Sequence, residues 1–83
     1  MLLENKVAVI TGAAHGIGAA FATGYAREGA KLVIADILDG NDTVDNAAKV
    51  GSEAIFLKTD VTRQDQCDAM AKAAADHFGR IDI

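Results

Sequence analysis

Short apolar runs alternate with longer helix-forming segments along this 83-residue chain, and few folds are compatible with such an alternation. Lys6–Ile10, Lys31–Asp36 and Ala54–Thr59 are rich in β-branched or aliphatic residues and nearly continuous in hydrophobicity, which is typical of strands buried on both faces. Strands that alternate with helices form a parallel sheet with right-handed crossovers. The sequence therefore predicts an α/β fold.

Three segments between and after these strands have helical periodicity. They are Gly16–Glu28, which Gly29 ends, Asp39–Val50, which Gly51 ends, and the segment from Thr62 to Phe78, which Gly79 ends. Apolar residues recur at helical spacing in each: Ile17, Ala20, Phe21 and Gly24 in the first, Val44, Ala47 and Ala48 in the second, and Cys67, Met70, Ala71, Ala74 and Phe78 in the third.

Local signals refine this interpretation of the helices. Thr62, with Asp65 three residues later, predicts a capping box at the start of the third helix. Gly24 in mid-helix costs about 1 kcal/mol relative to alanine, and we expect close packing on the sheet to compensate. Cys67 is expected to be a small core residue. His77 lies in the last turn of its helix, where the dipole favours a cation, and is not expected to bind a metal.

The expected topology is one half of a doubly wound sheet with strand order 3-2-1. A further apolar run, Ile81–Ile83, should begin a fourth strand on the open side of the first. The sequence stops about three residues into that strand. We therefore expect residues 1–83 to be one partial domain, truncated after its third βα unit, or a fold completed by a second polypeptide.

Composition excludes several classes of function. The net charge is −4 without any cluster of Lys or Arg, which makes nucleic acids and anionic membranes poor partners. A single cysteine excludes an internal disulfide and a multi-cysteine zinc site. No apolar run is long enough to span a bilayer, and the N-terminus lacks the order of a secretory signal. We expect a cytoplasmic location and no metal site.

The segment from Thr11 to Gly18 carries the strongest functional signal. Its glycines, Gly12, Gly16 and Gly18, lie between a strand and a helix, where backbone N–H groups and the positive end of the helix dipole bind a pyrophosphate. The glycine spacing of 4 then 2 differs from the usual dinucleotide spacing of 2 then 3. A Walker A loop is excluded, because no Lys-Ser or Lys-Thr follows the last glycine.

Asp36 ends the second strand, where a carboxylate can accept hydrogen bonds from both adenosine ribose hydroxyls. The same carboxylate would repel the additional phosphate of NADP, at a cost of about 4 kcal/mol for two charges about 4 Å apart at an effective dielectric near 20. Neither the Ala13–His15 loop nor Ile37 supplies an Arg or Lys for that phosphate, although His15 could carry a partial charge. These features favour NAD over NADP.

The chain resembles the N-terminal portion of a short-chain dehydrogenase/reductase throughout its length. The resemblance lies in Thr-Gly-x-x-x-Gly-Ile-Gly, the acid ending strand two, Asp60-Val61 after strand three, and the closing segment Phe78–Ile83. It implies a Rossmann fold, with Thr11 bracing the loop. The residues that it implies for cofactor binding are Gly12, His15, Gly16, Ile17 and Gly18 around the pyrophosphate and adenosine, Asp36 and Ile37 beside the ribose and adenine, and Asp60 and Val61 at the adenine.

Simpler roles remain open for four of these residues. Asp36 could be merely a solvated acid that ends its strand. Asp60 could serve as the N-terminal acid of the third helix, a role compatible with adenine binding. His15 could be a plain exposed loop residue. Thr11 could be purely structural.

The resemblance implies hydride transfer between a nicotinamide and a secondary alcohol or ketone, in a homo-oligomer. The family catalyses this with an Asn, a Ser and a Tyr-x-x-x-Lys pair beyond this segment, and no catalytic residue is assigned here. The one tyrosine, Tyr25, is followed four residues later by Gly29, and the one serine is Ser52. The alternative is a truncated, non-catalytic chain that binds nucleotide or forms oligomers.

Overall fold

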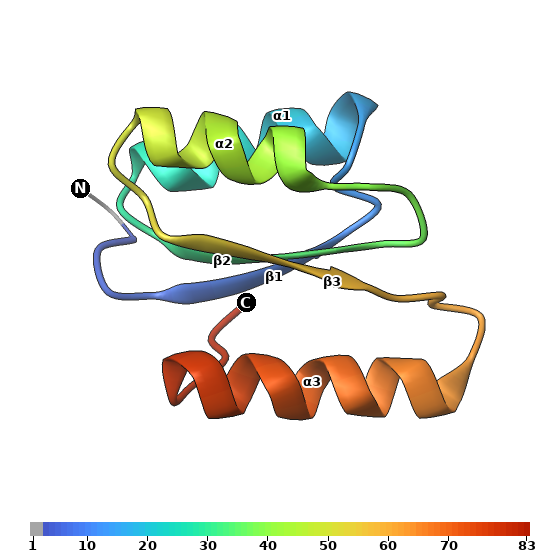
Figure 1. Cartoon of the computed structure of the whole chain (residues 1–83). Helices are drawn as coiled ribbons and strands as arrows, with labels where there is room; N and C mark the ends of the chain where they lie inside the picture. The colour runs from blue at the N-terminus through green and yellow to red at the C-terminus, as the bar shows by residue number, and fades with distance from the viewer. Residues whose placement is uncertain (1–2) are drawn as a thin grey trace.

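The computed structural model describes residues 3–83, which form a three-stranded parallel sheet. The strands pair in the order β1-β2-β3, and helices α1 and α2 cover one face while α3 covers the other (Figure 1). The elements are β1 (Val7–Thr11), α1 (Gly16–Arg27), β2 (Lys31–Asp36), α2 (Asn41–Lys49), β3 (Ala54–Lys58) and α3 (Gln64–Phe78). The α/β class and the strand order are confirmed.

The two faces of the sheet bury different kinds of side chain. Under α1 and α2 the core consists of alanines around Leu32 and Ile34. Under α3 it consists of Val7, Val33 and Ala74, with partly buried aliphatic and aromatic neighbours. Adjacent residues of β2 thus enter opposite cores, which explains why the strand is continuously hydrophobic.

The segment Ile81–Ile83 runs beside β1 on the side away from β2. The Val9 N–H donates to the Ile83 carbonyl oxygen at 3.0 Å, and the Ile83 N–H donates to the Val7 carbonyl oxygen at 3.2 Å, which is the pattern of a parallel pair. The Asp82 carboxylate also accepts the Val7 N–H at 2.9 Å. Arg80 and this N–H lower the pKa of Asp82. The expected position of a fourth strand is confirmed.

The helical face predicted for α1 points away from the sheet. Ile17 is 77% exposed and Phe21 58% exposed, while Ala22 and Ala26 are buried. The helix carries two apolar stripes, and the alanine stripe packs on the sheet because it permits the closer approach. Gly24 lies on the exposed side, and a Cβ there would have nothing within 4 Å. The expectation that Gly24 serves close packing was therefore wrong.

The predicted capping box of α3 was also wrong. The N-cap is Arg63, which makes no side-chain capping bond, and the Thr62 hydroxyl instead donates to Asp60 Oδ1 at 2.6 Å. Asp60 precedes Thr62 by two residues and forms a local Asx turn, which draws the hydroxyl away from the helix. Cys67 is half-buried, with its sulfur 3.5 Å from the Val61 carbonyl oxygen, so the core assignment holds only in part.

Among residues 3–83, no helix combines the length and the hydropathy that crossing a membrane requires.

The 83-residue chain expressed alone is expected to self-associate and to unfold without a sharp transition. Pairing with residues 81–83 reaches Val9 while β1 continues to Thr11, and Ile17 and Phe21 are exposed nearby in sequence. Open strand edges and exposed apolar side chains promote association. Light scattering after size exclusion at several concentrations measures this. A monomer with a cooperative melt would contradict the expectation.

Candidate functional site

The three segments singled out from the sequence meet at one edge of the sheet. Because β1, β2 and β3 are parallel, their carboxyl ends lie together. The Gly12 N–H donates to the Ala35 carbonyl oxygen at 2.9 Å, and the Thr59 N–H donates to the Asp36 carbonyl oxygen at 2.9 Å. These two bonds fix the glycine-rich loop, the end of β2 and the segment after β3 relative to one another.

The loop requires glycine at its three glycine positions for two different structural reasons. Gly12 and Gly16 have φ values of +65° and +62°, a region that side chains disfavour, and the space where their side chains would stand is open. Gly18 instead packs against the turn. A Cβ at Gly18 would overlap the Gly12 carbonyl oxygen and lie 2.8 Å from its carbonyl carbon. The loop is thus tightly packed at Gly18 and leaves open space beside Gly12 and Gly16.

The N-terminus of α1 faces this loop with unpaired donors. The first hydrogen bond of the helix runs from the Ala19 N–H to the His15 carbonyl oxygen, at 3.4 Å. The N–H groups of Ile17 and Gly18 lie before this bond in the helix and therefore have no acceptor within it. His15, the N-cap, makes no side-chain capping bond, and the first turn contains no acidic residue. The helix end therefore offers N–H groups and a positive dipole to an anion without a competing carboxylate.

Asp36 is tied to the glycine-rich loop. Its Oδ1 accepts the Leu38 N–H at 3.0 Å and its Oδ2 accepts the Ala14 N–H at 3.1 Å. The Leu38 N–H and, to a lesser degree, the Ala14 N–H lower the pKa of Asp36 below its ordinary value because they bond the charged form. A carboxylate has about four acceptor sites, so capacity for two ribose hydroxyls remains.

Asp60 is positioned by its own neighbours. Its Oδ1 accepts both the Thr62 N–H, at 2.9 Å, and the Thr62 hydroxyl, which together lower the pKa of Asp60. The Asp60 N–H donates to Gln66 Oε1 at 2.7 Å. Because both Thr62 bonds use Oδ1, acceptor capacity remains on Oδ2.

The remaining predicted residues are exposed around the same edge. Ile37 is 58% and Val61 53% exposed, and His15 and Thr11 are exposed as well. Large apolar side chains exposed beside an anion-binding loop are consistent with a site that holds an aromatic base.

Three residues at the candidate site were not predicted from the sequence. Ala14 and Gln66 act through a backbone N–H and a side-chain oxygen, and neither carries a local signal. Lys58 is the register partner of Asp36 on the neighbouring strand, so it is a cation on the same face of the sheet. Lys58 could have been found from the sequence, because the third strand begins at the predicted residue, Ala54, and a parallel register with the second strand then places Lys58 beside Asp36.

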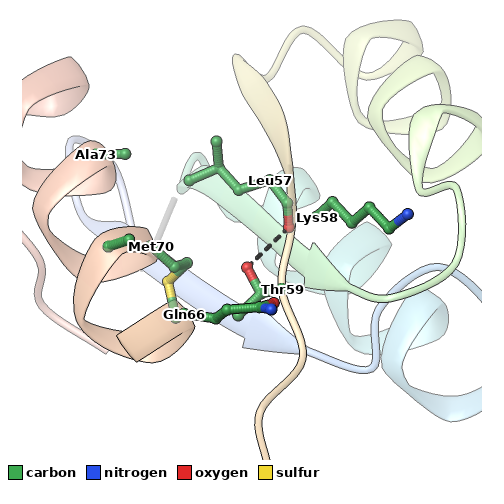
Figure 2. Close-up of a pocket in the computed structure, with 7 residues that line it drawn as sticks. Leu57, Lys58, Thr59, Gln66, Met70 and Ala73 are labelled. Atoms are coloured by element: carbon green, nitrogen blue, oxygen red, sulfur yellow. Dashed lines mark hydrogen bonds between the residues drawn. The ribbon is translucent and has the colours of Figure 1, made fainter. Parts of the chain in front are cut away.

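A separate cavity of about 270 Å³ lies between β3 and α3. In Figure 2, Leu57, Gln66 and Met70 line it while Lys58 points to the other side of the strand. The glycine-rich loop packs in the core under α1 and α2, through Ala13, so this cavity is on the opposite face of the sheet. None of the residues predicted for cofactor binding lines this cavity, although Gln66, which accepts the Asp60 N–H, does.

Within residues 3–83, no three His, Cys, Asp or Glu side chains gather in an arrangement that could hold a metal ion.

In the full-length protein, Gly18→Ala is expected to destabilise the fold by about 1–3 kcal/mol, because the added methyl overlaps the Gly12 carbonyl group. Gly24→Ala, the same substitution in the same helix, is expected to stabilise by about 1 kcal/mol because the site is exposed and open. Urea unfolding of both variants measures the difference. Equal stability of the two variants would contradict the packing described for Gly18.

Comparisons with known sequences agree with this geometry. Residues 6–83 match the family model described as short chain dehydrogenase. The chain is 53% identical over 83 residues to galactitol 2-dehydrogenase of Agrobacterium fabrum, covering 100% of this chain and 32% of that protein. It is 45% identical over 84 residues to sorbitol dehydrogenase of Cereibacter sphaeroides, again covering 100% of this chain and 32% of the relative. The chain thus spans about a third of the length of these relatives.

Solved structures show the same fold. A short-chain dehydrogenase/reductase from Burkholderia phymatum in complex with NAD has a TM-score of 0.90 and 44% identity, covering 98% of this chain and 30% of that one. A short-chain type dehydrogenase/reductase from Mycobacterium marinum has a TM-score of 0.93 and 36% identity, covering 96% and 33%. Sequence, fold and loop geometry agree, and the chain belongs to the short-chain dehydrogenase family.

Proposed function

We propose that residues 1–83 form the N-terminal cofactor-binding part of an NAD-dependent dehydrogenase that acts on a secondary alcohol or ketone. The observation that carries this proposal is the juxtaposition of an open glycine-rich loop, a helix N-terminus and the Asp36 carboxylate at one sheet edge. One neighbour of the same fold is a complex with NAD.

The residues at this edge fit a dinucleotide. The N–H groups of Ile17 and Gly18 would hold the pyrophosphate, since the space above Gly16 is open. Asp36 would accept the ribose hydroxyls, while Ile37 and Val61 would flank the adenine with Asp60 at its amino group. Gly12 and His15 would complete the wall of the site.

NAD is favoured over NADP because Asp36 is an anion held in place by two backbone N–H groups. A 2′-phosphate about 4 Å away would cost about 4 kcal/mol before relaxation. Lys58 stands in register with Asp36 but forms a surface cation on a flexible stem, which offsets only part of this repulsion.

A bound nicotinamide would supply the hydride acceptor, taking H⁻ from the carbinol carbon of a secondary alcohol while the hydroxyl proton leaves to a base. Residues 1–83 supply binding and orientation, and the proton-transfer groups of the family would come from other residues. The curated relatives named for galactitol and sorbitol make these polyols the first substrates to test.

The proposal extends to a homo-oligomer in the cytoplasm. The exposed apolar side chains of α1 (Ile17 and Phe21) and of the segment beside β1 (Ile81 and Ile83) support this proposal, because further protein in the assembled enzyme would bury them.

In the full-length enzyme, Asp36→Ala is expected to weaken NAD binding by about 1–3 kcal/mol, because the ribose hydroxyls lose their acceptor. The same change should weaken NADP binding less or strengthen it, since the repulsion is removed. Titration calorimetry with both cofactors measures this. Asp39→Ala is a control, because the Asp39 carboxylate accepts hydrogen bonds from Asn41 and not, among the described residues, from the glycine-rich loop. Unchanged NAD affinity in Asp36→Ala would refute the ribose assignment.

The affinity for NAD is expected to stay constant from pH 8 to pH 5. The lowered pKa of Asp36 keeps its carboxylate ionised across this range, and protonation begins to remove the acceptor only below the ordinary Asp value. Fluorescence titration at each pH checks this. A decline in NAD affinity between pH 7 and pH 5 would contradict the assignment of the ionised Asp36 carboxylate as the ribose acceptor.

A further inference from the structure

Thr43 is a buried polar residue of α2 that reaches the glycine-rich loop. It is 2% exposed, and its hydroxyl donates to the Ala13 carbonyl oxygen at 2.7 Å, with the Ala14 carbonyl oxygen at 3.3 Å. A hydroxyl has one proton, so the shorter bond is the principal one. Thirty residues separate the partners, and the bond therefore ties α2 to the loop.

The acceptor of this bond belongs to the same peptide group as the donor to Asp36. The Ala13 carbonyl and the Ala14 N–H are the two ends of one planar trans peptide. Thr43 holds its oxygen, and its N–H donates to Asp36 Oδ2 at 3.1 Å. Rotation of this peptide plane would break both bonds together.

The Ala13–Ala14 peptide lies in a glycine-rich segment, so its orientation has to be fixed by other residues. Gly12 and Gly16 lie on either side of the Ala13–His15 segment, and glycines allow many backbone conformations. Ala13 and Ala14 are themselves buried, so a reoriented carbonyl would lose its partner away from water. In series, the two hydrogen bonds also polarise one another.

We propose that Thr43 is a positioning residue of the dinucleotide site: its hydroxyl fixes the Ala13–Ala14 peptide, which in turn holds the Asp36 carboxylate toward the adenosine ribose. The inference rests on the proposed function. Thr43 touches neither the cofactor nor the reacting atoms and acts through Ala14 and Asp36.

Two variants of Thr43 separate the effect of its hydroxyl from that of its shape. In the full-length enzyme, Thr43→Val keeps the shape and removes the donor, whereas Thr43→Ser keeps the donor. Val44→Ala is the matched control, because Val44 is the next residue of α2 and packs against the same core but has no hydroxyl with which to bond the loop. Thr43→Ala repeats the test should Thr43→Val fail to fold.

The probes are NAD, AMP and nicotinamide mononucleotide. Thr43→Val is expected to raise the dissociation constants of NAD and AMP by about three- to tenfold, the loss of one buried hydrogen bond, and to leave that of nicotinamide mononucleotide unchanged. KM for NAD should rise with kcat unchanged, because the lost interaction serves binding alone. Thr43→Ser should bind within about twofold of wild type, and Val44→Ala should melt earlier yet bind normally.

A second measurement separates this inference from the proposed function. Carboxyl-carbon NMR of Asp36 without cofactor should show a higher pKa in Thr43→Val than in wild type, because the Ala14 N–H no longer bonds the charged form. The role of Thr43 would be overturned if the wild-type protein binds NAD and the Thr43→Val variant shows an unaltered affinity for AMP and an unaltered Asp36 titration. Wild-type protein that binds neither NAD nor AMP would overturn the proposed function as well.

Discussion

The parallel pairing of β1 with β2 determines where everything else in this structure lies. The register places Thr11 opposite Ala35, and the Gly12 N–H continues the ladder by bonding the Ala35 carbonyl oxygen at 2.9 Å. The loop after Gly12 and the side chain of Asp36 must therefore emerge at the same edge. With antiparallel pairing these two segments would lie at opposite ends of the sheet, and no common site would form.

Small side chains make this arrangement tight. Ala22 and Ala26 of α1 pack in the same core as Leu32 and Ile34 of the sheet, and Gly18 brings the first turn of the helix against the Gly12 carbonyl group. Close approach aims the helix N-terminus at the loop that precedes it, which is the geometry an anion requires. The same contacts that stabilise the fold thereby orient the donors of the candidate site, and larger residues would separate them.

The sequence could predict the elements and the sheet edge but not the finer contacts. The β-branched run of β2 and the glycines that flank α1, Gly16 and Gly29, are local signals, and the strand and the helix that they predict are confirmed. The outward orientation of Ile17 and Phe21 could not be predicted, because α1 carries two apolar stripes and only packing decides between them. The bond from Thr43 to the loop joins residues 30 apart and leaves no local pattern.

We propose that the sheet edge formed by the loop, Asp36 and Asp60 holds the adenosine half of NAD. A crystal structure of the full-length protein with NAD tests it most directly. We expect the pyrophosphate at the N–H groups of Ile17 and Gly18 and both ribose hydroxyls within hydrogen-bonding distance of Asp36. An adenosine bound elsewhere, for example in the cavity between β3 and α3, would contradict it.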